Sequence, residues 1–315
     1  MKIIITDAKT VTEGDIDLNV FSNLGEVEIY QMTSKSQLEK RIKDADILLC
    51  NKTPITAKTI EIAKNLKYIG LFATGFNNVD IDFAKQKGVA VCNAPDYSTD
   101  AVAQLTFSYI LSFYSKVNDY NKLVQNKEWI KSETFSYFPL PAYELSGKTL
   151  GILGFGAIGK KVYLIAKAFG MNVLVCNRSK IADKSVNQVD FDTMLKNSDI
   201  VSLHCPLNEQ SKGIMNKNAF EKMKKGAIFI NTARGPLVDE NALKQALESG
   251  HISGAGLDVL NIEPMPKNCS LLGVNNCIIT PHIAWAGLET RQRLVKIVYN
   301  NLSEFLKGNI INSVY

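Results

Sequence analysis

Short runs of β-branched and aliphatic residues alternate along this chain with polar segments of helical periodicity. A first series of runs occupies residues 3–6, 27–30, 47–50, 68–72 and 89–92. A second series occupies residues 149–153, 172–176, 200–204, 227–231, 255–259 and 277–280. Strands that alternate with helices form parallel sheets with helices on both faces. The chain is therefore predicted to be an α/β protein with two doubly wound parallel sheets.

Three further segments complete this prediction. Residues 99–120 carry a long apolar pattern after the helix start signal Ser98–Thr99, and we predict one extended helix there. Residues 135–144 are rich in aromatic side chains and proline, which indicates an ordered loop. Residues 289–306 are predicted to form a final helix.

Composition excludes several classes of protein. Of the 315 residues, 46% are hydrophobic and 21% charged, a globular balance, and the net charge of +5 is too small to indicate a nucleic acid partner. The first residues show no signal peptide, and no apolar run approaches the ~18 residues of a membrane helix. The six cysteines lack CxxC spacing and only three histidines are present. We expect a cytoplasmic protein with reduced thiols and no metal site.

A glycine motif joins the first strand of the second series to the helix after it. Gly154, Gly156 and Gly159 form a GxGxxG between residues 149–153 and the helical stretch 160–169. In a dinucleotide-binding unit the first glycine permits a tight turn, the second a close approach to pyrophosphate, and the third helix packing on the strand. The helix N-terminus then attracts the phosphates. This context favours a coenzyme site over three incidental turn glycines.

The end of the next strand bears on the choice of coenzyme. NAD sites normally place Asp or Glu there, about 20 residues beyond the glycines, to accept hydrogen bonds from the ribose. This chain has Asn177, followed by Arg178, Ser179 and Lys180. Asn177 does not repel a 2′-phosphate, and the next three side chains can donate to one. We expect NADP or NAD as coenzyme, with NADPH modestly favoured, although incidental charges on a solvated loop are the alternative.

Three polar residues follow three strands of the second series: Arg234, Glu263 and His282. Ligands of doubly wound sheets bind at the carboxyl ends of the strands, so these side chains are expected at one crevice. An arginine fork holds a carboxylate or carbonyl oxygen, and a histidine gives a proton to a developing alkoxide. A carboxylate beside the histidine stabilises the imidazolium and raises its pKa. Ordinary ion pairing, surface exposure or core packing is the alternative for each residue alone.

Several motifs in a fixed order carry a resemblance to a known family. They occupy residues 151–159, 203–207, 230–235, 256–259 and 280–285. On these motifs the chain resembles the D-isomer-specific 2-hydroxyacid dehydrogenases along nearly its whole length. Within that family it is most similar to the glycerate dehydrogenases, also called hydroxypyruvate or glyoxylate reductases. The closer likeness lies in residues 51–54, residues 135–144 and Trp285.

The resemblance implies two domains and a set of site residues. Residues 1–98 plus 285–315 correspond to a flavodoxin-like substrate domain, and residues 99–284 to an NAD(P)-binding Rossmann domain. The matching Arg234 binds substrate, Glu263 and His282 form the acid/base pair, and the backbone near Thr74 and Gly75 receives the substrate carboxylate. Trp285 closes the substrate pocket or packs in the core. Positions that match dinucleotide contacts are Thr106, Ile158, Pro206, Thr232 and Asp258.

The activity that the resemblance implies is the reversible reduction of a small 2-keto acid to its D-2-hydroxy acid. Hydroxypyruvate and glyoxylate are both candidate substrates, and a homodimer is expected because such enzymes are usually dimeric. An alternative of a different class stays open. Some transcriptional corepressors share this fold and these catalytic residues, and they act as regulators by docking peptides.

Overall fold

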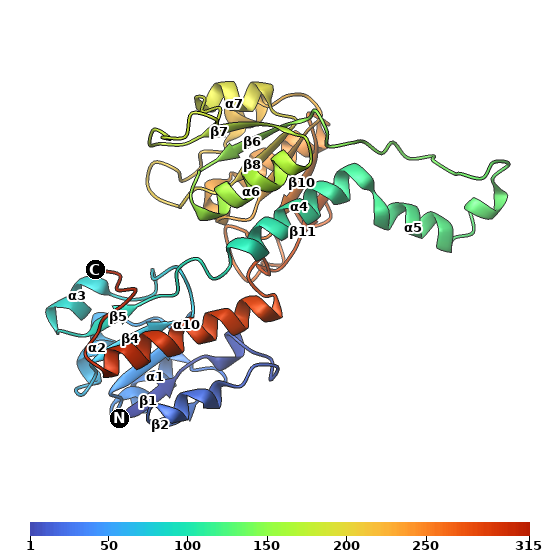
Figure 1. Cartoon of the computed structure of the whole chain (residues 1–315). Coiled ribbons are helices and arrows are strands. Elements are labelled where there is room, and N and C mark those ends of the chain that lie inside the picture. The colour runs from blue at the N-terminus through green and yellow to red at the C-terminus, as the bar shows by residue number, and fades with distance from the viewer. The chain divides into compact units, whose positions relative to one another are not determined.

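The computed structural model describes all 315 residues, which divide into two compact units (Figure 1). Unit 1 comprises residues 1–98 and 285–315, and unit 2 comprises residues 99–284. Each unit has its own parallel sheet with helices on both faces, so the predicted α/β class with two doubly wound sheets is confirmed. No helix in either unit is both long enough and apolar enough to span a bilayer.

The sheet of unit 1 has five parallel strands in the order β2-β1-β3-β4-β5. Their bounds are β1 (Lys2–Ile5), β2 (Glu26–Ile29), β3 (Ile47–Cys50), β4 (Tyr68–Leu71) and β5 (Ala90–Cys92). Side chains alternate between the faces: Ile3 and Ile5 belong to one core, and Ile4 belongs to the other. Both faces are covered, which explains why β3 is apolar and buried at every position.

The helices of unit 1 divide between these two cores. Helices α1 (Lys35–Ile42), α2 (Ala57–Ile62) and α3 (Ile81–Gln86) cover one face, and α10 (Leu288–Leu306) covers the other. The short 3₁₀ helices η1 (Ala8–Thr10) and η2 (Leu18–Asn23) lie on the α10 side.

The sheet of unit 2 has six parallel strands in the order β11-β10-β9-β8-β6-β7. Their bounds are β6 (Thr149–Leu153), β7 (Asn172–Cys176), β8 (Ile200–Leu203), β9 (Ala227–Asn231), β10 (Ile252–Leu257) and β11 (Cys277–Ile279). The chain winds outward from β6 in both directions. The strand order therefore reverses between β6 and β8, the place where doubly wound sheets bind their ligands.

The helices of unit 2 cover its sheet on both sides. One core contains side chains of α4 and α6, and the other contains side chains of α7, α8 and α9. The bounds are α4 (Thr99–Ser115), α5 (Val117–Gln125), α6 (Ala157–Ala168), α7 (Phe191–Asn197), α8 (Lys217–Lys222) and α9 (Glu240–Glu248), with 3₁₀ helices η3 (Trp129–Lys131) and η4 (Gly235–Leu237).

Two predicted elements of unit 2 are wrong in detail. The single helix predicted for residues 99–120 is broken at Lys116, whose φ of 51° is left-handed, so α4 ends and α5 begins in a new direction. Strand β10 begins three residues before the predicted start and ends at Leu257. The small residues at its start give no apolar run that would predict a strand there in the sequence. A Cβ at Gly256 would lie 2.6 Å from the Tyr109 ring, so close packing rather than apolar bulk explains the glycine there.

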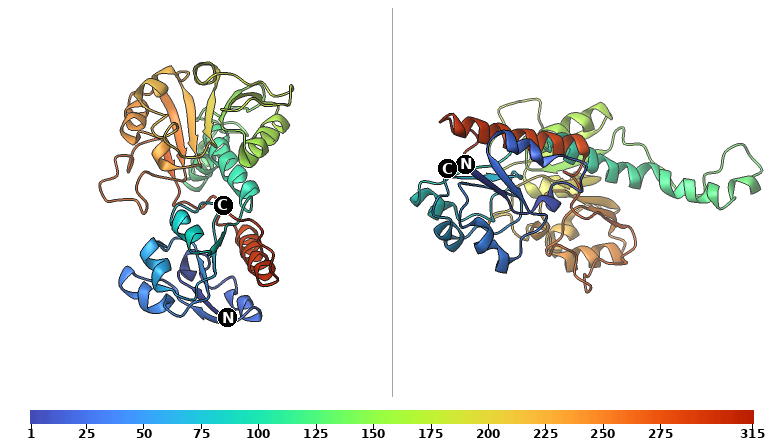
Figure 2. Two further views of the ribbon diagram at one scale, coloured as in Figure 1. Left: turned by 90° about the vertical axis from the view of Figure 1, so that its left-hand side faces the viewer. Right: turned by 90° about the horizontal axis from the view of Figure 1, so that it is seen from below.

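An arm formed by residues 116–144 extends away from the body of unit 2 (Figures 1 and 2). It contains α5 and η3, and residues 135–144 form no helix or strand, as predicted. Hydrogen bonds within the arm fold it on itself, among them one from Trp129 Nε1 to the Phe135 carbonyl at 3.1 Å. Ile130 is 80% exposed and Phe135 is 91% exposed. The arm therefore leaves apolar surface uncovered within one chain.

Candidate active site

The three glycines of the loop after β6 have different roles: two are needed by the fold, and one leaves space for a ligand. A Cβ at Gly154 would lie 2.6 Å from the Cys205 nitrogen, and one at Gly159 would lie 2.2 Å from the Gly154 carbonyl oxygen. Both glycines are thus required by the chain itself. Gly156 has an ordinary φ of −76°, and nothing lies within 4 Å of its missing Cβ. This bare face suits the close approach of a pyrophosphate.

The N-terminus of α6 is open to an anion. Gly156 is the N-cap and supplies no side-chain cap, so the first N–H groups of this twelve-residue helix lack that partner. The Gly154 N–H donates to the Cys176 carbonyl at 2.9 Å, which fixes the loop against β7. Ile158 in the first turn is half-buried. The loop therefore fits the dinucleotide phosphates that its sequence predicts.

The loop after β7 brings the predicted coenzyme residues together. Asn177 Oδ1 accepts from the Phe155 N–H at 3.1 Å, and Asn177 Nδ2 donates to the Ser179 carbonyl at 2.9 Å. Its amide thus joins the glycine loop to the β7 loop, a role that the sequence did not show. Arg178, Ser179 and Lys180 are exposed, and no carboxylate lies within 4 Å of either cation.

The histidine and glutamate predicted at separate strand ends form a pair. His282 Nδ1 lies 2.7 Å from Glu263 Oε2, and Glu263 Oε1 accepts from the Leu260 N–H at 3.0 Å. The carboxylate is thus fixed by its own loop and orients the imidazole. His282 Nε2 makes no hydrogen bond within the chain, so this nitrogen is available for proton transfer to a bound molecule.

Asp258 holds the backbone that carries His282. His282 has a φ of 56°, a left-handed conformation that is uncommon for a residue with a Cβ. The Asp258 carboxylate accepts from the N–H groups of Ile283 and Ala284, each at 2.8 Å, and the Asp258 carbonyl accepts from the His282 N–H at 2.9 Å. Only 1% of Asp258 is exposed, and burial raises the pKa of its carboxyl.

A series of hydrogen bonds behind Asp258 was not predicted from the sequence. The Thr280 hydroxyl donates to Asp258 Oδ1 at 2.5 Å and is also hydrogen-bonded to the Tyr109 hydroxyl. The Tyr109 hydroxyl also lies 3.0 Å from the Leu257 carbonyl and shares its single proton between this oxygen and Thr280. In the sequence, Tyr109 occupies an apolar position of the α4 pattern and reads only as a core residue. Its hydroxyl connects α4 to the turn of His282.

Arg234 lies in a tight turn directly after β9. Asn231 forms this turn: its Oδ1 accepts from the Ala233 N–H at 3.0 Å and its Nδ2 donates to the Arg234 carbonyl at 2.9 Å. A Cβ at Gly235 would lie 2.0 Å from the Leu260 carbonyl oxygen, so the turn packs against the loop of Glu263. The Arg234 side chain is exposed and has no carboxylate partner within 4 Å. The guanidinium is thus available to an anionic ligand.

The remaining predicted coenzyme residues lie around the same sheet edge. Thr106 and Thr232 are buried, with their hydroxyls 3.1 Å apart, and connect α4 to the end of β9. Pro206 is exposed after β8. His204, two residues earlier, bonds to Ser202, and burial lowers the pKa of its imidazole to about 3. It is neutral at physiological pH and serves the structure.

The predicted substrate residues belong to unit 1. Thr74 follows β4, and its hydroxyl donates to the Ala94 carbonyl at 2.8 Å. Thr74 is exposed and Gly75 half-buried. The Asn93 amide donates to the Thr74 carbonyl at 2.7 Å, which fixes this loop from a second side. Trp285 is half-buried and packs against the core beneath α10, and its closing of the substrate pocket stays a prediction.

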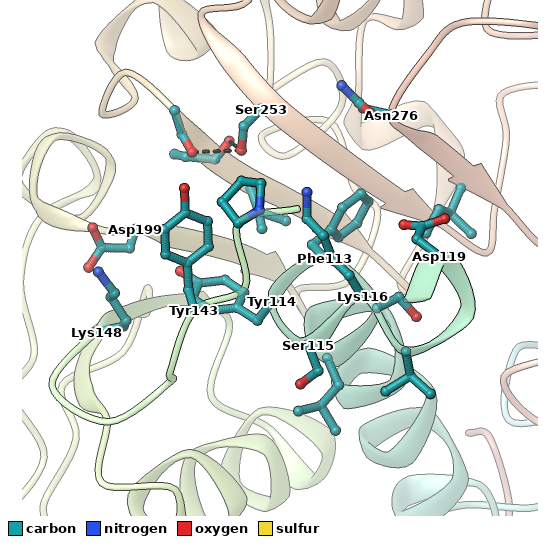
Figure 3. Close-up of a pocket in the computed structure, with 18 of the residues that line it drawn as sticks. Phe113, Tyr114, Ser115, Lys116, Asp119, Tyr143, Lys148, Asp199, Ser253 and Asn276 are labelled. Carbon is teal, nitrogen blue, oxygen red and sulfur yellow. Dashed lines mark hydrogen bonds between the residues drawn. The ribbon is translucent and has the colours of Figure 1, made fainter. Parts of the chain in front are cut away.

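A hollow of about 920 Å³ lies elsewhere in unit 2 (Figure 3). Figure 3 shows Lys148, Asp199, Ser253 and Asn276 around it, and these residues lie at the amino ends of their strands. The glycine loop and His282 follow the carboxyl ends. The hollow is therefore on the opposite edge of the sheet and takes no part in the candidate active site.

Comparisons with known proteins agree with this geometry. Residues 107–284 match the family model described as D-isomer specific 2-hydroxyacid dehydrogenase, NAD binding domain. The whole chain is 42% identical to the hydroxypyruvate reductase of Blautia hydrogenotrophica, across 99% of that enzyme. It is 36% identical to the glycerate dehydrogenase of Methylorubrum extorquens, with 99% of this chain and 98% of that one covered.

Solved structures give the same result. A protein from Thermus thermophilus matches over the full length of both chains with a TM-score of 0.90 and 34% identity. An acyclic imino acid reductase in complex with NADPH and D-Arg also matches over both full chains, with a TM-score of 0.85 and 31% identity.

Proposed function

Because the chain belongs to the D-isomer specific 2-hydroxyacid dehydrogenases, we propose that it reduces hydroxypyruvate or glyoxylate reversibly to the D-2-hydroxy acid. The observation that carries this proposal is the His282–Glu263 pair, which lies at the same sheet edge as the glycine loop. The alternative of a peptide-docking regulator receives no support, because the relatives reported above are named as reductases and dehydrogenases.

Different residues of the chain have different roles in the reaction. The nicotinamide coenzyme supplies the hydride to the carbonyl carbon when it is bound. His282 gives the proton at Nε2 to the carbonyl oxygen and takes it back in the reverse direction. Glu263 stabilises the imidazolium through Nδ1. The Arg234 fork holds the substrate oxygens, and the backbone at Thr74 and Gly75 receives the carboxylate.

NADPH is the coenzyme that this protein prefers. Asn177 at the end of β7 carries no negative charge, and the Arg178 and Lys180 side chains beside it have no carboxylate partner. A 2′-phosphate carries close to two negative charges, so even exposed cations attract it. Because solvent screens these contacts, we expect a modest preference of about tenfold in kcat/KM.

The protein acts as a homodimer in the cytoplasm. The arm exposes apolar side chains, including Ile130 and Phe135, that a second copy would cover. All six cysteines are free thiols, which suits a reducing compartment. Sedimentation velocity at two protein concentrations tests the dimer, and a monomer at both would refute it.

Steady-state kinetics tests the reaction. Hydroxypyruvate, glyoxylate, pyruvate and phosphohydroxypyruvate are each supplied with NADPH or NADH, and oxidation of the coenzyme is followed by its absorbance. We expect the highest kcat/KM with hydroxypyruvate or glyoxylate and NADPH. No turnover with any of the eight combinations would reject the enzymatic function, and a preference for NADH would reject only the coenzyme assignment.

A further inference from the structure

Gln188 lies beside the coenzyme loop without belonging to it. Its segment runs parallel to the end of β7: the Val175 N–H donates to the Asn187 carbonyl, and the Val189 N–H donates to the Val175 carbonyl, each at 2.9 Å. These bonds fix the backbone of Gln188 against the strand. The half-buried side chain is thereby placed next to residues 177–181.

The amide of Gln188 makes three hydrogen bonds to that loop. Nε2 donates to the carbonyls of Asn177 and Ser179, each at 3.0 Å. Oε1 accepts from the Ile181 N–H at 2.9 Å. Both amide hydrogens are used, and the three bonds span the stretch that contains Arg178, Ser179 and Lys180. One side chain thus bonds to the loop before, within and after its cationic part.

Core packing supports this loop only at its end, where Ile181 packs against the core that contains α4 and α6. Arg178, Ser179 and Lys180 are all exposed. Gln188 also lines a shallow hollow of about 540 Å³ together with Lys180, Asp183 and Lys184. The other side-chain bonds that bear on the loop are those of Asn177, to Phe155 and Ser179. The shape of residues 177–180 therefore depends on two amides, and Gln188 makes the larger number of bonds.

We propose that Gln188 is the positioning residue that sets the coenzyme preference of this enzyme. It fixes the conformation in which the cations and the hydroxyl of residues 178–180 face a 2′-phosphate at the end of β7. It acts through the loop and does not itself touch the coenzyme. The inference rests on the proposed coenzyme site after β7, where dinucleotide-binding folds discriminate between the two coenzymes.

Two variants and one control test the proposal. Gln188→Met keeps the length of the side chain and removes all three bonds. Gln188→Glu keeps the acceptor for Ile181 and replaces Nε2 by an oxygen, which then faces the carbonyls of Asn177 and Ser179. Asn187→Asp adds the same charge one residue away, at an exposed side chain outside the loop contacts, and serves as the matched control.

The measured quantity is the ratio of kcat/KM for NADPH to that for NADH in one preparation. This ratio does not depend on how much of the protein is folded. We expect the ratio to fall about tenfold in both Gln188 variants, as donors and acceptors lose their partners, and to change less than twofold in Asn187→Asp. We expect the KM for the keto acid to stay constant.

The outcomes separate this inference from the coenzyme assignment. A wild-type preference for NADH overturns the assignment, whereas the role of Gln188 survives if Gln188→Met still changes the ratio about tenfold. A ratio in Gln188→Met within twofold of the wild-type value overturns the role of Gln188. The ratio could also change equally in Asn187→Asp and Gln188→Glu and stay constant in Gln188→Met. That result would assign the effect to charge and would also overturn the role of Gln188.

Discussion

The two sheets of this protein are built alike, but their carboxyl edges carry different chemistry. In unit 2 the edge carries an imidazole, a carboxylate and a guanidinium, each partly exposed. In unit 1 the edge consists of loops with fixed backbones. There the buried Asp7 carboxylate accepts from the N–H groups of Asn51, Lys52 and Thr53 at 2.6–2.9 Å.

The difference shows how one type of sheet serves two purposes. A proton is transferred by side chains that change protonation, and unit 2 supplies them on short turns at successive strands. A carboxylate is held well by backbone N–H groups whose positions do not change. We therefore expect substitutions of the proton-transferring side chains at the unit 2 edge to lower kcat, and substitutions at the unit 1 edge to raise the KM for the keto acid.

The largest effect is expected from His282→Asn. Asparagine tolerates the left-handed backbone of this position better than most residues, so the imidazole is removed with little strain. Turnover should fall about a hundredfold or more, while coenzyme affinity measured by fluorescence titration stays constant. His251→Asn, at a histidine bonded to the Met223 carbonyl in another loop, is the control. A loss below threefold would remove His282 from proton transfer.

Arg234→Lys is expected to have the next largest effect. Lysine keeps the charge but loses the planar fork that holds two oxygens at once. We expect kcat/KM for the keto acid to fall about thirtyfold, with the KM for coenzyme unchanged. Arg41→Lys, on the surface of unit 1, controls for the substitution itself. Wild-type kinetics would show that the exposed guanidinium does not bind substrate.

Substitution of Gly156 and of Gly159 should have different effects, the first on coenzyme binding and the second on stability. Gly156→Ala should leave the thermal denaturation midpoint unchanged and raise the coenzyme KM about tenfold, because its Cβ meets open space that a pyrophosphate would fill. Gly159→Ala should instead destabilise the protein by about 1–3 kcal/mol, because its Cβ meets a carbonyl oxygen. Thermal denaturation and coenzyme KM are measured on both variants. Similar behaviour of the two would contradict this assignment.

Glu263→Gln tests the electrostatic part of the pair. Glutamine keeps the shape of the side chain and removes the negative charge that stabilises the imidazolium. We expect kcat for reduction of the keto acid to fall about tenfold, with the KM for coenzyme unchanged. Steady-state kinetics at saturating coenzyme measures this loss, and Glu209→Gln at an exposed position is the control. A kcat within twofold of the wild-type value would exclude Glu263 from the mechanism.

The smallest effect is expected in unit 1. Thr74→Val keeps the shape of the side chain and removes the bond to the Ala94 carbonyl, so the loop loosens. We expect the KM for the keto acid to rise about fivefold with kcat unchanged, since one hydrogen bond is worth about 1 kcal/mol. Loss of kcat without a change in KM would break the contrast between the two edges.

Local patterns in the sequence predicted most of the strands and the main site residues. The alternation of apolar runs indicated both sheets, and the rule that ligands bind at the carboxyl ends of strands selected Arg234, Glu263 and His282. These inferences need only short windows of sequence. The pairing of Glu263 with His282 follows because their strands, β10 and β11, are neighbours in the sheet.

Other features depend on contacts between distant residues. The bonds of Tyr109 to Thr280 and Leu257 join positions more than 140 residues apart in the sequence, and no local pattern predicts them. The break at Lys116 also lacks a sequence signal, since neither glycine nor proline marks it. Strand β10 was misplaced because its glycines fit beneath aromatic side chains of α4. In each case tertiary packing decided the local structure.

The arm has a consequence on the scale of local unfolding. Its helix α5 buries no residue, so little within one chain opposes the opening of its backbone hydrogen bonds. In a lone chain its amide hydrogens should exchange with deuterated water far faster than those of the buried strand β8. If a second copy covers the arm, exchange there slows as protein concentration rises, while exchange in β8 stays the same. The rate of hydrogen exchange in peptides from the arm therefore shows whether the chain has assembled with a second copy.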